Sequence, residues 1–274
     1  MKDCKVIAIA NQKGGVGKST TALNLGIGLA NHGNRVLLID ADAQASLTIS
    51  LGCKQPDELE YSLMDVLQAV INGETVNHTA WLYRHPEGVD LMPSNIELSG
   101  LETRLINAVN RESVLKTYVN EVKNVYDYIL IDCAPSLGML TINSLAAADS
   151  VIISTQPHFL STKGLDLLLR SIAKIKKQIN PKIHIDGVLL TMVNSKAKFS
   201  QEIISLLRGQ YGQKIKIFQT EIPNSIRTVE ASERGVSIYA YDKKCKVAEA
   251  YENLTREVLD LEKQRTRSQI DRIR

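Results

Sequence analysis

Residues 11–20 read Asn-Gln-Lys-Gly-Gly-Val-Gly-Lys-Ser-Thr, between an apolar run at Lys5–Ala10 and a segment of helical periodicity at Lys18–Asn31. A glycine-rich turn between a strand and a helix N-terminus is the local structure that binds phosphate. Its glycines let backbone N–H groups surround phosphate oxygens, and the helix start adds partial positive charge. In such a loop Lys18 is expected to neutralise the β- and γ-phosphates, and the Ser19 hydroxyl is expected to hold Mg²⁺.

Short apolar runs alternate along the chain with segments of helical periodicity. The runs lack apolar–polar alternation, which is typical of strands covered on both faces in a parallel sheet. We therefore expect a doubly wound α/β fold, with a mostly parallel sheet flanked by helices and ligands at the carboxyl ends of the strands. The further runs are Arg35–Asp40, Val89–Met92, Tyr128–Asp132, Ser150–Thr155 and Ile185–Met192.

The composition is that of a globular protein. The chain has 274 residues, of which 44% are hydrophobic and 23% charged, which excludes the disordered and fibrous classes. We expect a single domain over 1–274, with a C-terminal helix at about 243–263 and a basic tail at 264–274. The net charge is +3, and residues 263–274 alone carry five basic side chains against Asp271. The basic excess therefore belongs to the tail and does not by itself indicate a nucleic-acid partner.

Three aspartates end two of the expected strands. Asp40 and Asp42 close the second strand, and Asp132 closes the run Tyr128–Asp132. Carboxylates at this edge of a parallel sheet can reach the γ-phosphate and its metal ion. For Asp40 two interpretations stay open, a partner of Mg²⁺ or a hydrogen-bonding residue at the end of the strand.

The phosphate loop departs from the common GxxxxGK[ST] pattern, because Gln12 stands at its first glycine and a second lysine, Lys13, leads the loop. The resulting KGGxGK[ST] is the deviant Walker A motif, and the sequence resembles the ParA/MinD group of P-loop ATPases. The resemblance is strongest to the small, Soj-like partition ATPases. It continues through VLLIDADAQASLT (36–48), YDYILIDCAPSLGMLTINSLAAAD (126–149) and IPNSIRTVEASERGVSIYAYD (222–242).

This resemblance implies roles for the loop and for the carboxylates. Lys13 would reach across a homodimer to the nucleotide of the partner, so that ATP binding drives dimerisation around two sandwiched ATP molecules. Asp42 would orient the attacking water, although Ala43 replaces the proline usual in the family. Asp132 would be the Walker B aspartate that holds Mg²⁺ through water. The nucleotide-binding residues would be Lys13, Gly14, Gly15, Val16, Gly17, Lys18, Ser19 and Thr20.

The resemblance also implies base and DNA contacts. Asn194 and Pro223 match positions beside the adenine base, although Asn194 could instead cap the following segment. Non-specific double-stranded DNA would contact Arg227 and Lys196, and the patch would extend over Lys243, Lys244 and Lys246. A ParB-type centromere-binding protein would stimulate hydrolysis and release the DNA. The expected location is the bacterial cytoplasm, on the nucleoid and without stable membrane association.

Two other functions are compatible with this scaffold. A MinD-like, membrane-cycling ATPase for division-site placement needs an amphipathic C-terminal helix, and the segment 261–274 offers only Leu261, Ile270 and Ile273 as apolar residues. The second alternative is a metabolic role. The chain could be a biosynthetic enzyme, such as a cobyrinate-synthase relative, or a metal-cluster carrier. Carriers generally have a C-terminal cysteine pair, and only Cys245 lies in that part of this sequence.

Overall fold

A computed structural model of the chain describes residues 4–74, 81–105, 108 and 110–273. The described residues form an eight-stranded sheet with the order β3-β4-β2-β5-β1-β6-β7-β8. Neighbouring strands are parallel except at the β3–β4 edge, which confirms the mostly parallel, doubly wound sheet. The strands are β1 (Lys5–Ala10), β2 (Val36–Ala41), β3 (Tyr83–Arg84), β4 (Val89–Met92), β5 (Tyr128–Cys133), β6 (Ser150–Thr155), β7 (His184–Val193) and β8 (Ile217–Pro223).

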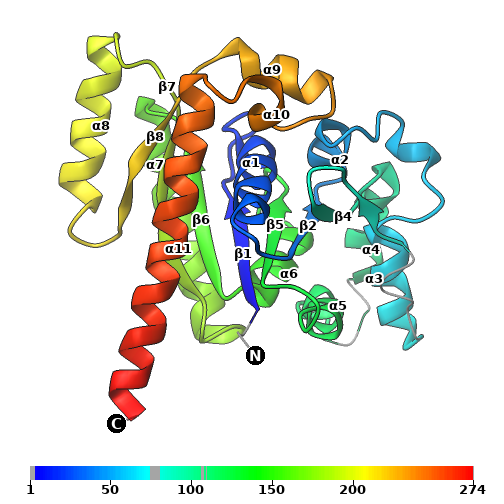
Figure 1. Ribbon diagram of the computed structural model, residues 1–274. Helices are drawn as coiled ribbons and strands as arrows, with labels where there is room; N and C mark the ends of the chain where they lie inside the picture. Colours follow the sequence, from blue (N-terminus) through cyan, green and yellow to red (C-terminus); the bar gives the residue numbers. More distant parts are fainter. Residues whose placement is uncertain (1–3, 75–80, 106–107, 109, 274) are drawn as a thin grey trace.

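Helices cover both faces of this sheet (Figure 1). One apolar core lies between the sheet and the face that carries α1 and α11, and a second lies on the face that carries α3 and α5 to α8. The longer helices are α1 (Lys18–Asn31), α3 (Leu63–Asn72), α5 (Val114–Val122), α6 (Met139–Ala147), α7 (Phe159–Gln178), α8 (Lys198–Tyr211), α9 (Ile226–Glu233) and α11 (Lys246–Ile273). Shorter ones are α2 (Ser46–Ser50), α4 (Leu101–Leu105), α10 (Ile238–Asp242) and the 3-10 turns Pro56–Glu58 and Ile96–Gly100.

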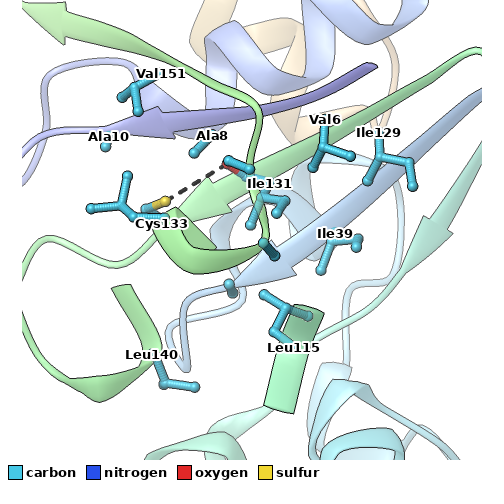
Figure 2. Close-up of a cluster of buried hydrophobic side chains, with 14 of the residues drawn as sticks. Val6, Ala8, Ala10, Ile39, Leu115, Ile129, Ile131, Cys133, Leu140 and Val151 are labelled. Carbon is cyan, nitrogen blue, oxygen red and sulfur yellow. Dashed lines mark hydrogen bonds between the residues drawn. The ribbon is translucent and has the colours of Figure 1, made fainter. Parts of the chain in front are cut away.

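Successive residues of each central strand enter opposite cores, because side chains alternate along a strand. Figure 2 shows Val6, Ala8 and Ala10 of β1 beside Ile131 and Cys133 of β5 in one of these cores. The Cys133 thiol is fully buried, and its Sγ lies 3.8 Å from the carbonyl oxygen of Ile131. Cys133 is therefore a packing residue.

The outer edge of the sheet is protected at β8. The carboxylate of Glu257, on α11, accepts hydrogen bonds from the backbone N–H groups of Gln219 and Thr220 at 3.1 and 2.7 Å. It also accepts one from the Thr220 hydroxyl at 2.6 Å. Helix α11 therefore both packs against β8 and provides hydrogen-bond partners for two of its backbone N–H groups.

The C-terminal helix differs from the prediction. It begins at Lys246 and continues to Ile273, so the expected boundary at 263 and the separate tail at 264–274 are wrong. The guanidinium of Arg265 contacts Asp186 on β7 at 2.5 Å and Glu262, one turn earlier, at 2.9 Å. The pair with Asp186 holds the helix against the sheet, and the pair with Glu262 lies within the helix.

Candidate active site

The phosphate loop connects β1 to α1 at the carboxyl edge of the sheet. Gly15 and Gly17 have φ angles of +67° and +77°, a left-handed region that only glycine adopts without strain. Gly17 is the N-cap of α1, and no side chain caps the helix there. The first N–H groups of α1 are therefore available to a ligand rather than to the protein's own side chains.

Lys18 lies inside this loop. The residue is only 7% exposed, and its Nζ donates to the carbonyl oxygen of Lys13 at 3.4 Å. A buried ammonium needs an anionic partner, so the position of Lys18 suits a bound phosphate.

Asp40 and Asp132 lie directly opposite each other on β2 and β5, and Asp132 is also in register with Ile9 of β1. Both carboxylates are fully buried. Burial and the charge of Asp40 hold the pKa of Asp132 well above its usual range, and nearby Ser19 and Lys18 lower it in part. Neither carboxylate oxygen of Asp132 completes a hydrogen bond with the described residues, which leaves both oxygens available for another ligand.

Asp40 is hydrogen-bonded within the protein. Its Oδ2 accepts from the backbone N–H and the hydroxyl of Thr48 at 2.8 and 2.7 Å, and its Oδ1 accepts from the N–H of Asp42 at 3.2 Å. Burial raises the pKa of Asp40 to about 6, and these hydrogen bonds oppose the rise. The contacts to Thr48 favour the interpretation of Asp40 as a hydrogen-bonding residue that fixes the start of α2.

Asp42 follows in the loop between β2 and α2. It is partly exposed, and its Oδ1 accepts the backbone N–H of Gln44 at 3.1 Å. One carboxylate oxygen therefore shapes the turn. The role in orienting water stays a prediction.

The leading lysine lies at the surface of the loop. Lys13 is exposed, and its Nζ lies 3.4 Å from Oε1 of Gln156, the residue that follows β6. Nε2 of Gln156 donates to the carbonyl oxygen of Gly15 at 3.0 Å. The side chain of Lys13 therefore lies at the surface of the loop and is open to solvent. A residue that contacts a second subunit must be accessible in this way.

The residues proposed for base recognition lie on adjacent strand ends. Val193 is the register partner of Pro223, and the N–H of Asn224 donates to the carbonyl oxygen of Val193 at 3.1 Å. Oδ1 of Asn194 accepts the N–H of Lys196 at 3.2 Å, so Asn194 caps its own turn in this structure. Contact of Asn194 and Pro223 with a base stays a prediction.

The residues proposed for DNA binding lie in segments that follow the carboxyl ends of β7 and β8. Lys196 is exposed in the loop after β7, and Lys243, Lys244 and Lys246 are exposed around the end of α10. Arg227, in the first turn of α9, forms an ion pair with Asp242 of α10. A phosphate that binds Arg227 must therefore compete with this carboxylate.

Sequence reasoning missed two polar residues that contact the phosphate loop from other strands. Thr191, near the end of β7, donates through its hydroxyl to the carbonyl oxygen of Val16 at 2.8 Å, and Gln156 contacts Gly15 as described above. Both are polar residues close to the carboxyl end of an apolar strand, which is the sequence signal that could have identified them.

Comparison with known proteins places this site in a family. A family model described as an AAA domain matches residues 4–185. The sporulation initiation inhibitor protein Soj of Bacillus subtilis is 40% identical over 260 residues, which cover 93% of this chain and 98% of Soj. The chain belongs to the ParA/Soj family.

A further relative carries a partition name, and a solved structure with a different name shares the fold. The chromosome partitioning protein ParA of Caulobacter vibrioides is 39% identical over 263 residues, covering 95% of this chain and 96% of that protein. A crystal structure named as cobyrinic acid a,c-diamide synthase from Mycobacterium smegmatis, with bound ADP and magnesium, has a TM-score of 0.81. It is 35% identical and covers 93% of this chain and 94% of that one.

The ParA/Soj site of this chain suits a magnesium–nucleotide complex. No group of three or more His, Cys, Asp or Glu side chains among the described residues is arranged to hold a metal ion. Mg²⁺ keeps several waters and is commonly bound through one or two protein oxygens together with phosphates. The two available oxygens of Asp132, beside Ser19 and Lys18, fit that mode. In the described part of the chain, no helix is long and apolar enough to span a membrane.

Proposed function

We propose that the chain is a Mg²⁺-dependent ATPase that dimerises on ATP, binds DNA without sequence preference and acts in DNA partition. The observation that carries the proposal is the phosphate loop, with Lys18 buried in it and the buried carboxylate of Asp132 beside Ser19 and Lys18. Relatives named as a chromosome partitioning protein and as a chromosome-partitioning ATPase support it.

In this proposal the residues of one subunit bind and orient the triphosphate. The N–H groups of the loop and the Lys18 ammonium hold the phosphate oxygens, while Ser19 and Asp132 are the residues that would hold Mg²⁺. When bound, Mg²⁺ neutralises part of the charge on the phosphate oxygens. Asp42 places a water in line with the γ-phosphate, because phosphoryl transfer depends mainly on positioning and electrostatics.

The second subunit completes the site. Lys13 is exposed, and its ammonium would contact the nucleotide of the partner. A cation that arrives from outside stabilises the charge of the transferred phosphoryl group, as an arginine finger does. ATP binding is thereby coupled to dimerisation, and hydrolysis stimulated by a ParB-type partner releases the dimer from DNA.

The proposal is tested by sedimentation velocity and by DNA binding. With ATP or a non-hydrolysable analogue the wild-type chain should sediment as a dimer, and with ADP as a monomer. Lys18→Ala should stay monomeric because it loses nucleotide binding. Normal ATP affinity in Lys18→Ala would refute the phosphate-loop assignment.

DNA binding should depend strongly on salt. If Arg227 and Lys196 of both subunits each contact one phosphate, the slope of log affinity against log salt concentration should be roughly −3.6, from about −0.9 for each contact. Arg227→Ala should reduce the slope, whereas a salt-independent affinity would remove both residues from the DNA interface. Lys243, Lys244 and Lys246 can be tested in the same way.

A biosynthetic function is the second candidate, since the solved structure from Mycobacterium smegmatis is named as a cobyrinic acid a,c-diamide synthase. The two functions differ in what accelerates ATP turnover. Partition predicts acceleration by DNA together with a ParB-type protein, and biosynthesis predicts acceleration by cobyrinic acid. The latter result would overturn the partition proposal.

A membrane-cycling function is tested directly. Co-sedimentation of the chain with anionic liposomes that requires both ATP and residues 261–274 would favour the MinD-like alternative. We expect no ATP-dependent membrane binding.

A further inference from the structure

The phosphate loop is held from the side by β6 and β7 as well as by β1. Thr191 of β7 is buried, and its hydroxyl donates to the carbonyl oxygen of Val16 at 2.8 Å. The carbonyl oxygen of Thr155 lies 3.2 Å from the same hydroxyl oxygen. Gln156, after β6, donates through Nε2 to the carbonyl oxygen of Gly15 at 3.0 Å. Two consecutive carbonyl groups of the loop are thus each held by a side chain from a neighbouring strand end.

The strand that carries Thr191 is irregular at this point. Met192, the next residue, has a φ angle of +52°, and the pairing of β7 with β8 shifts register between Leu190 and Val193. A non-glycine residue in this region is strained, and such strain persists only where the surrounding structure holds it. Irregularities of this kind redirect a side chain at the end of a strand, and here they accompany the contact between Thr191 and the loop. The Met192 Sδ also lies beside Nε2 of Gln156.

The contacts to the two carbonyl groups also fix the direction of the N–H groups that follow them. In a trans peptide the C=O and the following N–H point in opposite directions. Holding the carbonyl groups of Gly15 and Val16 toward β6 and β7 therefore directs the N–H groups of Val16 and Gly17 away from those strands. Backbone N–H groups that are already oriented bind phosphate without a reorganisation cost at the moment of binding.

We propose that Thr191 and Gln156 form a carbonyl clamp, a pair of positioning residues that orient the N–H groups of the phosphate loop for nucleotide binding. Neither residue needs to touch the nucleotide. The inference rests on the proposed function, because it concerns how the same loop binds phosphate.

The test compares Thr191→Val, which removes the hydroxyl, with Thr191→Ser, which keeps it. The readout is the dissociation constant of Mg²⁺-ADP measured by calorimetry, and the thermal unfolding midpoint is recorded for each variant. Loss of one buried hydrogen bond should weaken ADP binding by about 10-fold in Thr191→Val. Thr191→Ser should bind ADP like the wild type, even if it loses stability through the missing methyl group.

Gln156→Leu provides an independent variant in case Thr191→Val does not fold. Gln156 is only partly buried, so its replacement should be tolerated, and ADP binding should again weaken by several-fold. Wild-type affinity in both Thr191→Val and Gln156→Leu would overturn the clamp. Equal weakening in Thr191→Val and Thr191→Ser would overturn it too, because the hydroxyl would then not matter.

Failure of the clamp is distinguishable from failure of the proposed function. If the wild-type chain binds ADP but the clamp variants bind it equally well, only the clamp is wrong. If the wild-type chain binds no nucleotide, or if Lys18→Ala binds it normally, the phosphate-loop assignment itself is wrong.

Discussion

Asp40 of β2 and Asp132 of β5 are register partners on adjacent strands, and both side chains are fully buried. Alternation along the strands places them on the α1 side of the sheet, since their neighbours Leu38 and Leu130 enter the core that contains α1. Two carboxylates this close disfavour each other's ionisation. Asp40 is stabilised by its hydrogen bonds to Thr48. Ser19 and Lys18 offset the burial of Asp132 only in part, and in the proposed function a bound Mg²⁺ would supply the remaining positive charge.

Asp132→Asn should therefore separate stability from function. Removing a buried carboxyl group that Ser19 and Lys18 compensate only in part should raise the free energy of unfolding without Mg²⁺ by about 1–2 kcal/mol, as stabilising substitutions at functional sites commonly do. For a chain of this size, each kcal/mol should raise the midpoint of thermal unfolding by about 2–4 °C. The same variant should lose the Mg²⁺ dependence of ADP affinity. A less stable variant with unchanged Mg²⁺ linkage would contradict this assignment.

Asp42→Ala should bind ATP and yet hydrolyse it slowly. If Asp42 places the attacking water, its loss should reduce the single-turnover rate by about 10²-fold or more, while the loop and Lys18 still hold the phosphates. The variant should accumulate as an ATP-bound dimer on DNA, which sedimentation and filter binding can measure. Turnover at the wild-type rate would exclude Asp42 as the water-placing residue.

Lys13→Gln should bind ATP as a monomer. Lys13 is exposed and is not needed for contacts within the core, so the variant should fold normally and retain nucleotide affinity. It should fail to form the ATP-dependent dimer in sedimentation experiments. An unchanged dimer would eliminate the contact across subunits and leave the phosphate loop assignment intact.

Asp186→Asn should reveal a pH-dependent contribution to stability. Burial opposes ionisation of Asp186, but His184 and Ser150 and the charges of Lys5 and Arg265 outweigh it and lower its pKa to about 2. A folded-state pKa below the unfolded value stabilises the folded state above the unfolded pKa, here by about 2 kcal/mol. That stabilisation is lost as the pH falls from about 4 toward 2.

Urea unfolding of the wild type and of Asp186→Asn between pH 7 and pH 3 measures this contribution. The difference in unfolding free energy should be constant above about pH 5 and should shrink below pH 4. A difference that does not change with pH would mean that the charge of Asp186 does not contribute.

The central elements follow closely from local sequence. The expected strand Lys5–Ala10 and helix Lys18–Asn31 have those same bounds in the structure, because an uninterrupted apolar run and a glycine-rich turn specify them locally. The edge strands β3 and β8 were not predicted. In β8, Glu221 and Pro223 interrupt the apolar pattern, and two of its N–H groups depend on Glu257, which is distant in sequence.

The site was predictable only where its residues are contiguous. The phosphate loop and the strand-end aspartates lie in short motifs, so their residue types and spacing indicate their chemistry. Thr191 and Gln156 act on carbonyl groups that are 175 and 141 residues away. Their position near the carboxyl ends of apolar strands indicates that they lie at the same edge of the sheet as the loop. Which carbonyl groups they contact depends on which strands become neighbours, and the local pattern does not specify that order.

The two edge strands of the sheet, β3 and β8, limit how copies of the chain can assemble. At one margin β3 has only two residues, and at the other Glu257 occupies the N–H groups of Gln219 and Thr220. A short edge strand, or one whose N–H groups already have partners, resists the addition of a further strand, which is the route by which sheets grow into fibrils. Higher-order assemblies of this chain should therefore form through side-chain surfaces rather than by pairing of strands between copies.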